Sequence, residues 1–173
     1  MITYIIFLIL FQIEMPGNYQ KQGNTFSSYK HENDYSVMVG VHPTGGVAFV
    51  SKPYEGCISD NKILEDCGFF PYLDEGDWVL ADRGFTCHWL FAAKKAHLIT
   101  PSFKPKNAKV FSEEDILKSQ ALSKGRIYVE QMNERAKNWT FIHGPVTHYK
   151  EAVLEEAVYV CFFLANCTQC LVE

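Results

Sequence analysis

The chain has 173 residues, a formal net charge of −4 and a pI of about 5.9. This length suits a single globular domain over residues 1–173, and a content of 47% hydrophobic and 21% charged residues excludes a largely disordered chain. An acidic chain is also a poor free-standing DNA binder, because neutralising phosphates requires Lys and Arg. If the protein acts on DNA, we expect another domain or a partner protein to hold the DNA.

The first apolar segment, residues 3–14, is rich in β-branched and aromatic residues and predicts a strand that is buried on both faces. The segment is too short to span a bilayer. It lacks the basic start and the A-x-A-like cleavage site of a signal peptide, so a secreted protein is the least favoured alternative. Six cysteines without regular pairing along the chain favour a reducing compartment, and we expect the nucleus or the cytoplasm, with no membrane association.

The following residues, 15–24, predict a loop, because Pro, Gly and Asn interrupt any period. Further strands are predicted where β-branched and aromatic residues gather between turn signals, over 35–43, 45–53, 76–85 and 98–103, with a PTGG hairpin joining the first two. Helices are predicted over 61–67, 88–97, 112–139 and 151–167, and a basic loop over 104–109.

Three helix signals refine these boundaries. Ser59 or Asp60 is placed to cap the first helix, and Gly68 to end it. Ser112, followed by three acidic residues, marks the start of the long helix, whereas Gly125 is a weak point within it. A three-strand antiparallel meander followed by alternating strands and helices predicts an α/β fold with a mixed sheet and flanking helices. RNase H-like folds share this element order, although order alone does not single them out.

Asp82 directly follows the predicted buried strand and opens the turn ADRGF. A carboxylate at the carboxyl end of a central strand lies where open α/β sheets bind their ligands. The alternative is a turn or helix-capping Asp paired with a neighbour. On position alone, the turn or helix-capping Asp is the favoured interpretation.

Glu130 lies in the long predicted helix, where its neighbours Ile127 and Val129 indicate a face turned towards the core. Burying a Glu there is costly unless it is paired or bound to a metal. Placed against the end of the Asp82 strand, Glu130 could share with it a divalent ion such as Mg²⁺ or Mn²⁺, which prefer oxygen ligands. The alternative is a surface Glu paired with Arg126 or Lys137.

Taken together, three segments resemble the Harbinger/PIF-type DDE endonuclease family: SSYKHENDYSVMVGVHPTGGVAFVSKPYEGCISD, GDWVLADRGF and RIYVEQMNERAKNW. The resemblance covers about residues 10–170. It implies an RNase H-like fold and a transposase-derived, metal-dependent nuclease. In this family an Asp-Asp-Glu triad holds two divalent ions, Mg²⁺ or Mn²⁺. With these ions in place, DNA is cut by the in-line attack of water or of a 3′-hydroxyl on the phosphodiester.

Carried over by position, the resemblance makes Asp82 the second aspartate and Glu130 the glutamate of the triad, and so the predicted catalytic residues and metal ligands. Asp60 matches a further acidic position outside the triad; we interpret it as a helix cap first and a metal ligand second. Gln131 stands where relatives usually carry Arg, which removes a local ion pair.

The first aspartate of the triad has no counterpart. Relatives carry Ile-Asp-x-Thr-Glu-Ile before a Pro, and counting back from Pro16 places Phe7 at the Asp position. The resemblance therefore implies a domain truncated or altered at about residues 1–10, with weak or absent nuclease activity. The alternative is a non-catalytic interaction module, domesticated or decayed, on the same fold. The family also implies DNA recognition through a separate Myb-like partner, and a homodimer remains open.

Other sequence signals give weaker evidence for a functional site. Cys167 and Cys170 form a C-x-x-C pair, but a zinc site would need two more ligands at matching spacing. His31 could approach the site from the second strand, although a polar turn residue is the simpler interpretation. The apolar last helix predicts core packing, with an interaction face as the alternative.

Overall fold

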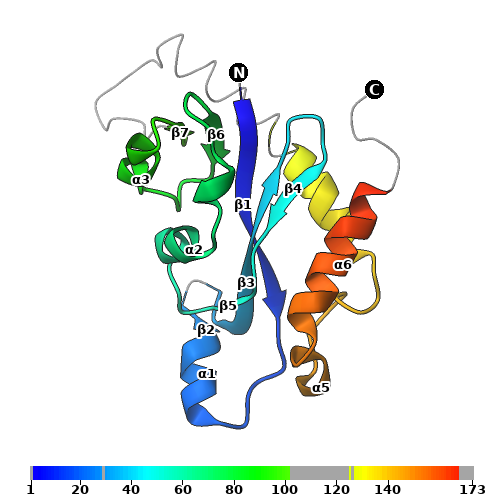
Figure 1. The fold of residues 1–173 in the computed structure, drawn as a ribbon. Helices are drawn as coiled ribbons and strands as arrows, with labels where there is room; N and C mark the ends of the chain where they lie inside the picture. The colour runs from blue at the N-terminus through cyan, green and yellow to red at the C-terminus, as the bar shows by residue number, and fades with distance from the viewer. Residues whose placement is uncertain (1, 29, 102–124, 126, 168–173) are drawn as a thin grey trace, which may run out of the picture.

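The computed structural model describes residues 2–28, 30–101, 125 and 127–167. A mixed sheet runs through the middle of the molecule, with helices on both sides (Figure 1). The strands are β1 (Ile2–Gln12), β2 (Phe26–Ser27), β3 (Glu32–Val41), β4 (Val47–Val50), β5 (Tyr54–Glu55), β6 (Trp78–Ala81) and β7 (His97–Ile99). The helices are α1 (Tyr19–Thr25), α2 (Asp60–Asp66), the 3₁₀ turn η1 (Phe70–Tyr72), α3 (His88–Ala93), α5 (His148–Glu151) and α6 (Leu154–Asn166). Residues 127–137 are also helical and are drawn in yellow in Figure 1.

β1 is the central strand of the sheet. On one side it pairs antiparallel with β3, which in turn pairs antiparallel with β2, β4 and β5. On the other side β1 pairs parallel with β6, and β6 pairs parallel with β7. This arrangement confirms the predicted mixed α/β class, with an antiparallel meander followed by parallel strands.

The core consists of two main layers, one on each face of the sheet. Because successive strand residues point to opposite faces, Phe7, Ile9 and Phe11 pack with α6 and residues 127–137. Ile6 and Leu8 pack on the other face with α2 and α3. The prediction that β1 is buried on both faces is therefore confirmed.

Gly125 shows why a poor helix former occurs where the long helix meets the sheet. A Cβ atom at this position would lie 2.8 Å from Leu80 Cδ2 and 3.4 Å from Ile5 Cδ1, and Leu80 is fully buried. The missing side chain therefore allows the backbone to approach β1 and β6 closely. What looks like a weak point in an isolated helix is a packing requirement in the folded chain.

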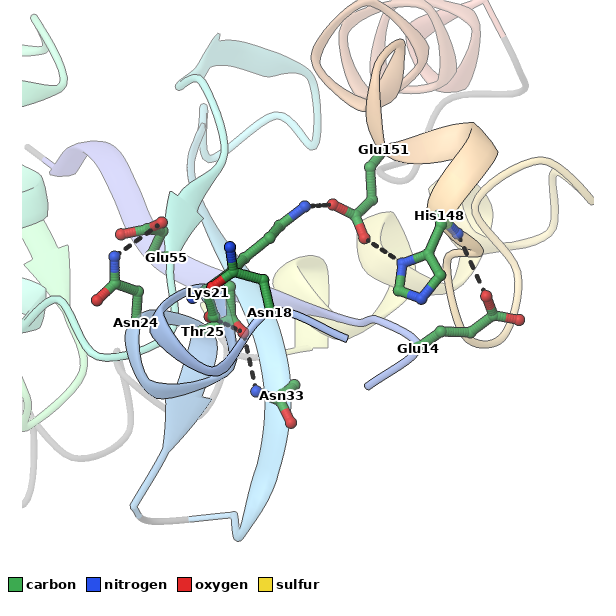
Figure 2. Close-up of polar contacts among 9 residues, drawn as sticks. All are labelled: Glu14, Asn18, Lys21, Asn24, Thr25, Asn33, Glu55, His148 and Glu151. Carbon is green, nitrogen blue, oxygen red and sulfur yellow. Dashed lines mark hydrogen bonds and ion pairs between the residues drawn. The ribbon is translucent and has the colours of Figure 1, made fainter. Parts of the chain in front are cut away.

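The loop predicted over residues 15–24 is wrong for its second half, which forms α1. The Asn18 side chain caps this helix by accepting a hydrogen bond from the Gln20 backbone N–H at 2.9 Å. At its other end, buried Thr25 accepts a hydrogen bond from Asn33 Nδ2 at 2.8 Å, which joins α1 to β3 (Figure 2). Local capping and one buried polar pair outweigh the Gly and Asn content.

A polar network joins α1 to α5, as Figure 2 shows. Lys21 forms an ion pair with Glu151, whose other oxygen lies 3.1 Å from His148 Nδ1. The hydrogen bond with Glu151 raises the pKa of Lys21. The His148 backbone N–H also donates to Glu14, at 3.3 Å, so the segment after β1 is held at the same point.

Several other predictions have a definite outcome. Ser59, not Asp60, is the N-cap of α2, and Gly68 follows this helix with a positive φ of 78°. The helix predicted over 151–167 corresponds to α6, which begins three residues later at Leu154, and the short helix α5 precedes it. The basic loop 104–109 and the helix start at Ser112 lie outside the described residues. Within the described part of the chain, no helix is long and apolar enough to cross a membrane.

Candidate active site

A cavity of about 330 Å³ opens where β1 and β6 meet the helix of residues 127–137. Three acidic side chains line it, those of Asp60, Asp82 and Glu130. Asn133 and Phe7 also contribute to its wall, and the rest of the described lining is apolar. The structure thus places all three sequence-predicted site residues around one cavity, together with Phe7, the residue that the resemblance aligns with the first aspartate.

The pairing of two parallel strands determines where Asp82 lies. Ile5 pairs with Leu80 and Ile6 with Ala81, so Asp82 and Phe7 come one residue beyond the last registered pair. Side chains alternate along a strand, which puts Asp82 on the same face as Leu80 and Phe7 on the same face as Ile5. Leu80 and Ile5 pack against Val129, and this face therefore looks towards the helix that carries Glu130.

The turn after β6 fixes the Asp82 carboxylate. Its Oδ1 accepts a hydrogen bond from the Arg83 backbone N–H at 2.8 Å, while the residue remains exposed at the mouth of the cavity. The carboxylate is thus held by the backbone of the turn and is exposed at the mouth of the cavity, where a ligand can reach it. Asp82 therefore belongs to the turn after β6 and also lies where it can contact a ligand in the cavity.

Glu130 reaches the cavity from the exposed side of its helix. The core-facing residues of this helix are Met132 and Ala136, with Val129 partly buried, whereas Ile127 is 53% exposed. The prediction that Ile127 marks a core-facing side is therefore wrong, because the helix turns that side to solvent. Glu130 lines the cavity at its rim and is not buried as the sequence argument assumed.

The alternative ion pairs of Glu130 have different outcomes. Arg126 lies outside the described residues. Lys137 donates a hydrogen bond from Nζ to the Leu10 carbonyl at 3.2 Å and lines a second cavity. The described contacts of Lys137 therefore tie it to β1.

Asp60 is the first residue of α2 and turns its side chain to the ADRGF turn. A Cβ atom at Gly84 would lie 1.8 Å from Asp60 Oδ2, so this carboxylate fills the space that any other residue at position 84 would need. Burial raises the pKa of Asp60; a hydrogen bond from its own backbone N–H opposes this, and the negative charge of Asp82 adds to it. The prediction of Asp60 as a cap is wrong, because Ser59 takes that role.

Asn133, which the sequence argument did not single out, lies one helical turn after Glu130. Residues three apart on a helix are neighbours on its surface, and Asn133 also lines the cavity. Its Oδ1 is buried and has no hydrogen-bond partner among the residues that the structure describes. The i, i+3 spacing from Glu130 is the sequence signal that could have indicated it.

The donor set fits one divalent ion of the oxygen-binding kind. Asp82 and Glu130 offer carboxylates, and the orphaned Asn133 oxygen is a hard donor still without a partner. Among the described residues, no three His, Cys, Asp or Glu side chains are grouped so that they could hold a metal ion by themselves. The described lining therefore offers carboxylates and one amide oxygen as candidate donors.

Two other candidates lie away from the cavity. His31 occupies the turn between β2 and β3 with a φ of 59°, next to the Phe26 ring, and does not line the cavity. Cys167 is an exposed free thiol, and Cys170, the second half of the C-x-x-C pair, lies outside the described residues.

Fold and cavity together define an α/β protein with carboxylates at the carboxyl end of a central parallel strand pair. The sequence pattern of the DDE superfamily endonuclease family matches residues 8–166, and the chain belongs to this family. The match begins one residue after Phe7. A comparison with curated proteins found no match.

Proposed function

We propose that this chain is the nuclease domain of a Harbinger/PIF-type transposase descendant, with an RNase H-like fold, whose cavity binds Mg²⁺ or Mn²⁺ through Asp82 and Glu130. We further propose that its DNA cleavage is weak or absent because Phe7 takes the place of a metal-binding carboxylate. The convergence of Asp82, Glu130 and Phe7 on one cavity, in a chain of an endonuclease family, carries the proposal.

The topology supports the RNase H-like assignment. The long central strand has antiparallel neighbours on one side and the parallel strands β6 and β7 on the other. The two predicted catalytic residues come from the end of β6 and from a helix that packs across β1. This order brings residues far apart in sequence to one edge of the sheet, where open α/β sheets place ligands.

Each residue of the cavity has a distinct task in this proposal. Asp82, held by the Arg83 N–H, and Glu130, on a helix packed through Val129, hold the cation from two elements. When bound, such a cation polarises the phosphodiester and activates the attacking water. Burial raises the pKa of Asp60, and the negative charge of Asp82 adds to this rise, which places the two carboxyl groups near each other at the cavity edge.

Phe7 is the basis for the weak or absent cleavage in this proposal. Its side chain is 8% exposed and packs into the core cluster of its face of the sheet. An aromatic ring offers no oxygen ligand, so the carboxylate that would help to hold two ions together is missing. We expect a rate loss on the scale of losing a catalytic group, about 10²-fold or more.

A second candidate is a non-catalytic interaction module. The observation that favours it, besides Phe7, is the outer face of α6, where Val160 and Phe163 are exposed. In either case the acidic charge of the chain supports the proposal that a partner protein supplies DNA recognition in the nucleus.

The test is a Mn²⁺ titration followed by thermal unfolding. At a Mn²⁺ concentration of 100 times the Kd, binding stabilises the fold by about 2.7 kcal/mol, or a Tm rise of about 5–10 °C for a domain of this size. We expect this rise in the natural chain and its loss in Asp82→Asn and in Glu130→Gln. Glu134→Gln, one turn further on the same helix and outside the cavity lining, is the matched control and keeps the rise.

A Tm that does not respond to Mn²⁺ in the natural chain would refute the cation site. Cleavage of supercoiled DNA tests the second half of the proposal. Robust cutting that disappears in Asp82→Ala would show that Phe7 does not impair the enzyme.

A further inference from the structure

The side-chain amide of Asn133 has a hydrogen-bond acceptor that the described residues leave unpaired. Its Oδ1 is buried and lacks a hydrogen-bond partner in the described part of the chain, although buried polar groups are nearly always paired. Leaving such a group unpaired costs free energy that an apolar side chain of similar size would not. Because Asn133 also lines the cavity, a ligand that enters the cavity is a candidate partner for this oxygen.

The position of Asn133 identifies that partner. It lies one turn after Glu130 on the same helix and lines the same cavity as Asp82. Phe7, which also lines the cavity, offers no oxygen on that face of the sheet. Of the described residues around the cavity, the three acidic ones and Asn133 are those whose side chains carry oxygen.

We propose that Asn133 supplies the third oxygen of a divalent-cation site formed with Asp82 and Glu130, an assignment that rests on the function proposed above. An amide oxygen is a suitable ligand for Mg²⁺ or Mn²⁺. Because Mg²⁺ keeps several of its waters, the contact is made either directly or through a coordinated water. Asn133 thus compensates in part for the carboxylate that Phe7 does not provide.

The charge of this ligand set has a consequence for stoichiometry. Two carboxylates and one neutral amide bring less negative charge to the cavity than three carboxylates. The repulsion between two divalent cations is then less well compensated. The site therefore holds a single ion, and binding saturates at one Mn²⁺ per chain.

The experiment compares the natural chain with Asn133→Leu and Asn133→Asp, using Mn²⁺ binding by isothermal titration calorimetry and thermal unfolding with and without Mn²⁺. Asn133→Leu removes the orphaned oxygen, so we expect a higher Tm without metal but about 10-fold weaker Mn²⁺ binding. Asn133→Asp adds a carboxylate beside Glu130, so we expect a lower Tm without metal and tighter Mn²⁺ binding.

Asn138→Leu is the matched control, because it makes the same chemical change at an exposed position just after the same helix. It should leave Mn²⁺ binding unchanged. If Asn133→Leu binds Mn²⁺ as tightly as the natural chain while Asp82→Asn does not bind it, the role of Asn133 is refuted and the proposed function stands. If the natural chain itself does not bind Mn²⁺, both are refuted.

Discussion

Two cavities lie along β1 and differ in the charge of their walls. The first, around Ile5–Leu8, carries three acidic side chains and no basic one in its described lining. The second, of about 240 Å³ around Leu10–Gln12, carries two basic and two acidic side chains, those of Lys30, Glu32, Asp34 and Lys137. Both contain buried oxygens without a hydrogen-bond partner in the described chain, one on Asn133 in the first cavity and two on Asp34 in the second.

In the second cavity, basic and acidic side chains of the chain itself lie close enough to shift one another's pKa values. Asp34 is 2% exposed, and burial raises its pKa, with the positive charge of Lys30 opposing the shift and Glu32 adding to it. Burial, and then Lys30, lowers the pKa of Lys137, which donates to the Leu10 carbonyl and lies 5.7 Å from the centre of the Phe11 ring.

The difference teaches that a buried carboxylate alone does not make a cation site. In the second cavity the lysines already balance the acidic charge, and burial favours the neutral acid. In the first cavity the described lining carries three acidic side chains and no basic one, which favours the binding of a cation there. We therefore expect Mn²⁺ to bind the first cavity and not the second.

The largest expected effect comes from Phe7→Asp, which places a carboxylate beside Asp82 and opposite Glu130. We expect Mn²⁺-dependent nicking of supercoiled DNA to rise by about 10²-fold or more, because a third charged ligand allows two ions to be held. Agarose-gel assays in excess Mn²⁺ measure the effect, since the exchange of a buried aromatic residue costs about 3–5 kcal/mol of stability.

Two controls accompany this variant. Phe7→Ala opens the same space without a carboxylate and should not cut DNA, and Phe7→Asp combined with Asp82→Asn should lose the gain. A folded Phe7→Asp variant, judged by circular dichroism, that binds Mn²⁺ no more tightly than the natural chain would show that this position does not face the ion.

A smaller effect is expected from Gly84→Ala. The new Cβ would displace the Asp60 carboxylate from the ADRGF turn, and we expect a loss of about 1–3 kcal/mol in chemical denaturation. In an Asp60→Ala background the obstructing oxygen is absent, so the same substitution should cost much less. Equal costs in both backgrounds would mean that the Asp60 carboxylate does not occupy this space.

The smallest effect is expected in the second cavity, from Asp34→Asn. Burial raises the pKa of the Asp34 carboxyl, so the folded state binds its proton more tightly than the unfolded state does. Its favourable contribution is present below the unfolded pKa of about 3.9 and is lost as the pH rises through the folded pKa. Asp34→Asn should therefore stabilise the chain at pH 7 by about 1–2 kcal/mol.

Thermal unfolding between pH 3.5 and pH 7 measures this gain, which should shrink towards the acidic end. Asp34→Asn should also leave the Mn²⁺-induced rise in Tm unchanged. A gain that is equal at every pH would indicate an effect other than ionisation, and a lost Mn²⁺ response would contradict the contrast between the two cavities.

The sequence was sufficient for β1, β3, β4, β6 and β7 and for the strand end that carries Asp82, because these depend on local patterns of apolar residues and turns, but the two-residue strands β2 and β5 were not predicted. Glu130 was predicted as a site residue from the resemblance. The separate argument that it lies on a core-facing side of its helix was wrong, because Ile127 faces solvent. Asn133 could not be selected in advance, because a polar helix residue gains meaning only once the facing of its helix is known. Gly125 is similar, since only the contact with Leu80 explains it.

The helix α1 was missed for a different reason. Its sequence contains a sound capping residue, Asn18, but also Gly23 and a preceding Pro16, which favour a loop on local grounds. The contacts that add to the Asn18 cap are tertiary, from Asn33 on β3 and from Glu151 on α5, and could not be read from the local sequence.

The most direct test of the central claim is a crystal of this chain soaked in Mn²⁺ and measured at a wavelength where manganese scatters anomalously. The proposal predicts an anomalous peak in the first cavity, about 2.0–2.5 Å from carboxylate oxygens of Asp82 and Glu130, with Asn133 in or next to the coordination shell. A cavity that stays free of anomalous density at millimolar Mn²⁺, or a peak that appears only elsewhere on the chain, would contradict it.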